Sequence, residues 1–264
     1  MTAPIPRDIP DLPAVPGKKP MLLPSHVPAA AVMSPVPRPL AAVFRLLTAL
    51  AAASGVTLEL LLGSPARVMS YFSVQSGALL ALVFVISAHR AWAARRPLPS
   101  ALTGAVLLYA VVSALVYHLL LAHTTPPFSM TGATTPPVPW HGQWIAAQLL
   151  HKVAPAAAAL DWLLLTAPGR LHLRQAAAWL VYPLAYLAFT LARGELLLPG
   201  APDRYLYPFL NVEQHGYRSV LANALLLGLA VYALAILLIA LDHARPNPVR
   251  RRAKTGFRLR PPVG

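Results

Sequence analysis

Apolar residues are gathered in six long runs that short polar segments separate. The runs cover residues 40–63, 70–89, 101–122, 143–166, 175–193 and 217–241. Each run has about 20 residues, the length that an α-helix needs to cross the hydrocarbon core of a bilayer. Lipid offers no hydrogen-bond partners to an open backbone, and the runs are too long and uniformly apolar for barrel strands. The pattern predicts an all-α polytopic membrane protein with six transmembrane helices.

The composition agrees with a membrane protein and excludes several functions. The chain has 264 residues, of which 57% are hydrophobic and 11% charged, and its mean hydropathy is +0.57. The net charge of +14 comes from basic residues at the chain ends and in short loops, so no nucleic acid partner is expected. The absence of cysteine excludes disulfides and thiolate chemistry.

Lysine and arginine collect on one side of the predicted spans. They follow the second run, lie between the fourth and fifth, and fill the end of the chain, whereas the other side has only Arg67, Arg193, Arg204 and Arg218. Because cytoplasmic loops are enriched in these residues, both termini are predicted to be cytoplasmic, in a multi-pass protein of the cell membrane. Residues 1–39 are predicted to be a disordered proline-rich arm, 40–241 the transmembrane domain, and 242–264 a basic tail.

The fourth run carries two ionisable residues, His151 and Asp161. Such groups are costly at membrane depth and mark functional sites by default. On an α-helix Asp161 lies about 15 Å from His151 along the axis and roughly 80° around it, so it cannot orient the imidazole. We therefore interpret Asp161 as a structural polar residue that bonds a neighbouring hydroxyl, and expect Asp161→Asn to keep activity.

Three predicted helices bring polar groups to a similar depth. Ser73 lies on the second, His118 on the third and His151 on the fourth. A hydroxyl beside an imidazole in a water-poor pocket can act as a nucleophile with its general base. The hypothesis is therefore that Ser73 and His151 are catalytic, with Gln75, His118 or Gln148 as substrate or oxyanion donors. No Walker loop, dinucleotide fingerprint or HExxH motif is present, so no cofactor or metal is expected.

Several segments resemble the androgen-induced-gene-like family of membrane proteins, in particular its bacterial six-span members. They are YFSVQSG in the second run, LLHKVAPAAAALDWLL in the fourth, WLVYPLAY in the fifth, and YPFLNV followed by GY before the sixth. The resemblance covers roughly residues 40–241. It implies a membrane-embedded hydrolase of fatty acid esters of hydroxy fatty acids, with membrane lipids and a lipid ester as partners. Ser73 stands where the family has its catalytic threonine, Gly77 where bacterial members usually have asparagine, and His151 matches the histidine.

Two other functions fit the same residues. In the first, His151, Asp161 and Glu59 line a polar path through a non-enzymatic carrier or channel. In the second, His118 and His151 hold a metal or haem between facing helices. The sequence gives no oligomeric state.

Overall fold

The chain is described by a computed structural model over residues 36–124, 127–132, 136–201 and 204–246. The predicted proline-rich arm, up to residue 35, and the basic tail from residue 247 lie outside the described residues. Within the described part every regular element is helical, which confirms the all-α class. The elements in chain order are α2 (Pro39–Leu62), α3 (Pro65–Val68), α4 (Phe72–Trp92), α5 (Ser100–Val116), η1 (Tyr117–Leu121), α6 (Gly142–Gln148), η2 (Leu149–Val153), α7 (Ala154–Leu160), η3 (Asp161–Leu165), α8 (Leu173–Trp179), α9 (Val181–Leu196), η4 (Pro208–Leu210) and α10 (Val212–Ala244).

Five helical segments are long and apolar enough to cross a membrane, so the described chain has the character of a membrane protein. They are Pro39–Leu62, Phe72–Trp92, Ser100–Leu121, Leu173–Leu196 and Val212–Ala244. They correspond to the first, second, third, fifth and sixth of the predicted runs. Helical turns also continue from Gly142 to Leu165, through the fourth run, but as two α-helical and two π-helical pieces.

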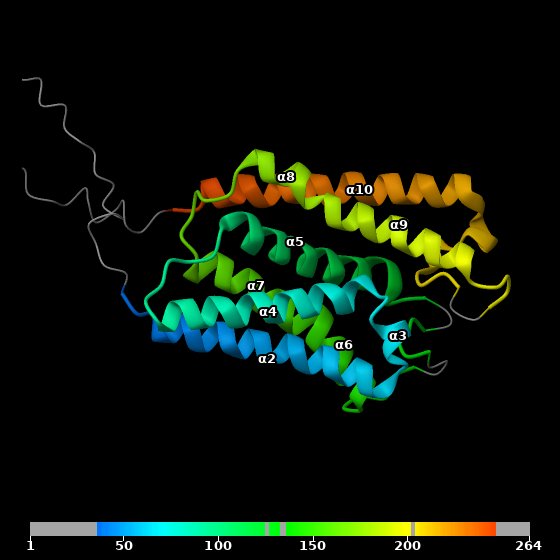
Figure 1. Cartoon of the computed structure of the whole chain (residues 1–264), viewed down its shortest axis with the longest axis horizontal. Coiled ribbons are helices and arrows are strands. Elements are labelled where there is room, and N and C mark those ends of the chain that lie inside the picture. Colours follow the sequence, from blue (N-terminus) through cyan, green and yellow to red (C-terminus); the bar gives the residue numbers. More distant parts are fainter. Residues whose placement is uncertain (1–35, 125–126, 133–135, 202–203, 247–264) are drawn as a thin grey trace, which may run out of the picture. The chain divides into compact units, whose positions relative to one another are not determined.

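Helix α5 lies between two groups of helices. It packs against α4 and α7 and also contacts α10, while α2 packs along α4 and along the segment from α6 to η3 (Figure 1). Figure 1 also shows the start of α2 and the end of α10 at the same end of the bundle. Residues from α4, α5, η2, α9 and α10 therefore meet in the interior.

A proline fixes the break between α8 and α9. Pro183 has no backbone N–H, and its ring clashes with the carbonyl four residues earlier, which is that of Trp179. The freed Trp179 carbonyl accepts the Tyr109 hydroxyl at 2.9 Å, and the Trp179 indole donates to the Ala101 carbonyl at 2.8 Å. Both ties hold α8 against α5 on one side of the interior.

The predicted sixth run begins just after a backbone kink. Gly216 has φ of +72°, a left-handed conformation that glycine adopts without steric cost, and it divides the first turn of α10 from the long apolar part. At the other end of α10, Asp242 is buried and accepts the backbone N–H groups of Arg170 and Leu171 at 2.7 and 3.0 Å. Asp242 thus fastens the segment before α8 to the end of α10.

Candidate functional site

The helix that carries His151 is locally widened into the π-helix η2. The Ala154 N–H bonds the Leu149 carbonyl, five residues back, instead of four. Pro155 supplies the physical reason, since it lacks an N–H and cannot sit over the His151 carbonyl four residues earlier. Single π-helical turns inside α-helices are frequent at functional sites.

Two glycines let this widened turn approach its neighbours. A Cβ atom on Gly55 of α2 would lie 2.8 Å from Leu150, and one on Gly77 of α4 would lie 2.7 Å from it. Real Cβ atoms do not come so close, so only glycine allows Leu150 to sit between the two helices. Leu150 is the residue before His151, and this contact sets how deeply the imidazole enters the bundle.

His151 is buried, with 2% of its surface exposed. Its Nδ1 atom lies 3.5 Å from Ser113 Oγ of α5, which is the long end of the hydrogen-bond range. The Tyr117 ring stacks on the imidazole, with centroids 4.1 Å apart and planes 2° from parallel. Among the described residues its Nε2 atom has no hydrogen-bond partner, although it is fully buried. Such unsatisfied nitrogens are rare in folded proteins and call for a functional explanation.

A cavity of about 90 Å³ lies beside His151. Its polar lining comes from Ser73, Ser113, His151, Tyr186 and Tyr207, and the remaining lining residues are apolar. The structure therefore brings the predicted pair Ser73 and His151 to one cavity. Ser73 is buried, and its hydroxyl donates to the Met130 sulfur at 3.2 Å.

Tyr207 adds a phenol to the same wall. It precedes η4, is 5% exposed and lines the cavity, and its hydroxyl interacts with that of Ser73. Burial raises the pKa of Tyr207 well above its usual range, and the Ser73 hydroxyl opposes this only in part. Tyr207 is thus a neutral hydrogen-bond donor next to the candidate nucleophile.

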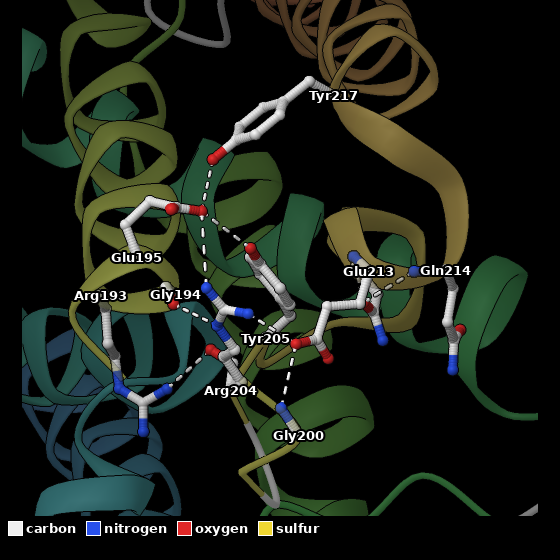
Figure 2. A network of polar contacts seen from close by, with 10 residues as sticks. Arg193, Gly194, Glu195, Gly200, Arg204, Tyr205, Glu213, Gln214 and Tyr217 are labelled. Atoms are coloured by element: carbon white, nitrogen blue, oxygen red, sulfur yellow. Dashed lines mark hydrogen bonds and ion pairs between the residues drawn. The ribbon is translucent and has the colours of Figure 1, made fainter. Parts of the chain in front are cut away.

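A polar network holds the segment that carries Tyr207, between the ends of α9 and α10 (Figure 2). Arg204 donates to Glu213 at 2.6 Å and to the Gly194 carbonyl at 2.5 Å. The hydroxyls of Tyr205 and Tyr217 both donate to the Glu195 carboxylate. The hydrogen bond to Glu213 raises the pKa of Arg204, so the guanidinium stays charged. The network ties the chain on either side of Tyr207 to two helices that line the cavity.

The three predicted oxyanion donors lie outside the lining of this cavity. Gln75 donates to the Met69 carbonyl and accepts the Tyr182 hydroxyl, at 2.9 and 2.8 Å. His118 packs edge-on against Tyr117, and Gln148 is half-buried one turn before His151 on the same helix. Tyr207 is the better placed donor.

Asp161 lies apart from the cavity and is paired with a cation. Arg45 of α2 donates to both of its carboxylate oxygens, at 2.8 and 3.3 Å, and the Thr166 hydroxyl donates at 3.2 Å. The ion pair is mostly buried, with side-chain exposures of 12% for Arg45 and 8% for Asp161. The sequence pattern had suggested the hydroxyl and missed the arginine.

No group of three or more His, Asp and Glu side chains in the described ranges could hold a metal ion. His118 and His151 do meet a common residue, because the ring of Tyr117 contacts both imidazoles. The phenol occupies the place between the two histidines where a shared ligand was considered.

Sequence reasoning missed Ser113, Tyr117 and Tyr207. Serine inside an apolar helix is common, so Ser113 carried no signal until a histidine was found against it. Tyr207 was assigned to the aromatic belt at the membrane surface, because YLYPFLNV is rich in rings. Its alternation of buried and exposed residues could not be separated from that pattern.

No family model, curated protein or solved structure matches the chain.

Proposed function

We propose that the protein is an integral membrane hydrolase that cleaves lipid esters of the fatty-acid ester class, with Ser73 as nucleophile and His151 as general base. One observation carries the proposal: the buried Nε2 atom of His151 has no partner in the described chain, and its ring lines an apolar cavity with Ser73. The sequence resemblance to the androgen-induced-gene-like family supports the same two residues independently of the cavity.

The proposed topology has six spans with both termini in the cytoplasm of the cell membrane. The sixth span is the interrupted helix from Gly142 to Leu165, which has the length but carries His151, Lys152 and Asp161. An even number of crossings fits the position of the start of α2 and the end of α10 at one end of the bundle (Figure 1). The distribution of lysine and arginine favours the cytoplasm for that end.

His151 has the arrangement of an oriented base. In the tautomer whose Nδ1–H donates to Ser113 Oγ, the Nε2 atom carries the lone pair that accepts a proton. A base held by a third group is the recurring logic of nucleophilic catalysis. Ser113 then acts as a positioning residue, and the stacked ring of Tyr117 fixes the plane of the imidazole.

The reaction proceeds in two steps. Ser73 Oγ attacks the ester carbonyl carbon while His151 takes the hydroxyl proton, and Tyr207 donates to the developing oxyanion. His151 returns the proton to the departing alcohol, which leaves an acyl group on Ser73. Water then attacks this ester with His151 again as base, the bond to Ser73 Oγ breaks, and a free fatty acid is released. Catalytic hydrogen bonds are often long before substrate binds, which fits the contact of Ser73 with Met130 in the free protein.

The cavity wall suggests an apolar substrate that enters from the membrane. Helices α9 and α10 contribute Leu184, Leu187 and Leu227 to the lining, and most of the surface of both helices is exposed. Ligand sites lined mainly by apolar groups with a few placed polar atoms select apolar ligands of fixed orientation. An acyl chain beside the Ser73 hydroxyl meets both requirements.

A polar path through the bundle has less support. Neither of the two described cavities that His151 lines includes Asp161, and the Asp161 carboxylate is occupied by Arg45 and Thr166. We therefore favour the enzyme over a carrier or channel.

Filling the cavity from α10 is expected to block hydrolysis. Gly228 lines the cavity, and a Cβ atom there meets no other atom within 4 Å, so Gly228→Phe should fold and place its ring in free space. We expect release of fatty acid from a long-chain lipid ester by the purified protein to fall by about tenfold or more, because a lost binding site of a few methylenes costs that much. The assay is fatty acid release in detergent or nanodiscs.

Leu229→Phe is the matched control, since Leu229 is the next residue and is 56% exposed. It should leave both activity and thermal stability near wild type. An inactive wild-type protein, or a fully active Gly228→Phe variant, would contradict the proposed function.

A further inference from the structure

His151 also lines a second and smaller cavity, on the side of the α2 helix and the loop before α6. This chamber of about 30 Å³ is lined by Glu59, Tyr117, Phe128, Ser129, Met130, Thr131, Pro137, Gln143, Ala147 and His151. Its lining is polar where that of the first cavity is apolar. One imidazole thus faces both an apolar and a polar space.

The carboxyl group in this chamber is unsatisfied. Glu59 is 4% exposed, and among the described residues its side chain has no hydrogen bond or ion pair. Buried polar groups are almost always hydrogen-bonded, to protein or to ordered water. A carboxyl group with nothing to bond in the protein therefore indicates a ligand in the chamber.

The loop wall of the chamber is built from side-chain hydrogen bonds. Gln143 of α6 donates to the Thr131 hydroxyl at 2.7 Å, and Ser129 and Thr131 hydroxyls lie 2.9 Å apart. Met130, between these two, is the residue whose sulfur accepts the Ser73 hydroxyl. The chamber is thereby closed by a segment that also touches the candidate nucleophile.

We propose that this chamber is a water site, in which Glu59 holds the water that His151 activates to release the acyl group from Ser73. Size supports it, because one buried water needs about 10–15 Å³ of such space and two to four polar partners. Glu59, Tyr117 and Gln143 provide partners of the right kind. The assignment rests on the proposed hydrolysis, and Glu59 acts in its second step alone.

The second step is balanced by water and by the protein's own groups. The water oxygen bonds the acyl carbon on Ser73, and His151 takes the water proton. The bond from the acyl carbon to Ser73 Oγ then breaks, His151 returns the proton to that oxygen, and the fatty acid leaves. Attack by an added alcohol instead of water gives an ester of that alcohol, with the same proton transfers.

The competition between water and methanol tests the assignment. Glu59→Leu fills the chamber with an apolar side chain, while methanol still reaches Ser73 through the apolar cavity. We expect the ratio of methyl ester to free fatty acid to rise by about tenfold in Glu59→Leu and to stay near wild type in Glu59→Gln, which keeps a polar group for the water. The ratio is independent of the amount of folded enzyme, so a merely structural defect does not move it.

Gln143→Leu changes the chamber from its other wall and serves if Glu59→Leu does not fold. Gln148→Leu is its control, because Gln148 lies on the same helix outside the chamber lining. An unchanged product ratio in both Glu59→Leu and Gln143→Leu would overturn the water site. A wild-type protein that forms neither product would contradict the hydrolysis and not the chamber.

Radiolytic labelling decides the chamber without activity. Water next to a buried side chain generates hydroxyl radicals there, so Met130, which is 4% exposed, should be oxidised in the wild type and protected in Glu59→Leu. Equal oxidation of Met130 in the two proteins would overturn the proposal.

Discussion

Replacing His151 with alanine is expected to lower the rate of lipid-ester hydrolysis by about a thousandfold, since general-base catalysis contributes 10²–10⁴-fold. Ser73→Ala should have a similar effect, because it removes the atom that bonds the acyl group. Ser113→Ala should cost only about tenfold, since it frees the orientation of the imidazole and leaves the base in place. The measurement is kcat for fatty acid release by each purified variant.

The double variant distinguishes a working pair from two separate contributions. Residues that act as one unit show strongly non-additive losses, so Ser73→Ala combined with His151→Ala should be no slower than either single variant. Ser87→Ala is the control, a buried serine on the same helix as Ser73 and outside the cavity. Full activity in either single variant, or losses that multiply in the double variant, would sink the assignment.

Breaking the ion pair between Arg45 and Asp161 is expected to cause the largest loss of stability. Asp161→Asn leaves the guanidinium of Arg45 mostly buried and without its anion, which should lower the free energy of unfolding by about 3 kcal/mol. Arg45→Met should cost a similar amount, because it strands the carboxylate. Replacing both, as Arg45→Met with Asp161→Leu, should return to within about 1 kcal/mol of wild type, since apolar residues tolerate that environment. Unfolding in mixed detergent micelles measures all three variants.

Thr166→Val is the matched control for this pair. It removes the other donor to Asp161 and keeps the salt bridge, so it should cost about 0.6 kcal/mol, the average for hydrogen bonds between membrane helices. If Asp161→Asn is as stable as Thr166→Val, the ion pair does not hold α2 to the interrupted helix. The folded fraction of Asp161→Asn should still hydrolyse ester, because Asp161 lies outside the cavity lining.

Hydrophobic run length was enough to predict most of the helices, because crossing a bilayer demands a stretch of apolar residues that is visible without any tertiary contact. The second run is a clear case, predicted as 70–89 and found as α4, Phe72–Trp92. Placing Ser73 and His151 at a common depth also needed only run order and distance along each helix. These two residues indeed line one cavity.

The contacts of His151 and Asp161 could not be predicted in this way. Assigning faces in the fourth run assumed a uniform α-helix of 100° per residue, whereas Leu149–Val153 and Asp161–Leu165 are π-helical and rotate the faces. Arg45 was overlooked as a partner because it is the single arginine in an otherwise apolar run, 116 residues before Asp161. Such a pairing depends on how α2 packs, which periodicity does not encode.

Covalent labelling with a serine-reactive fluorophosphonate tests the central claim most directly. The activated Ser73 oxygen should displace fluoride from phosphorus, and peptide mass spectrometry should find the phosphonyl group on Ser73. The account predicts labelling of Ser73 in the wild type and in Ser113→Ala, and none in His151→Ala. Labelling of Ser113 instead, or labelling of Ser73 that persists without His151, would contradict it.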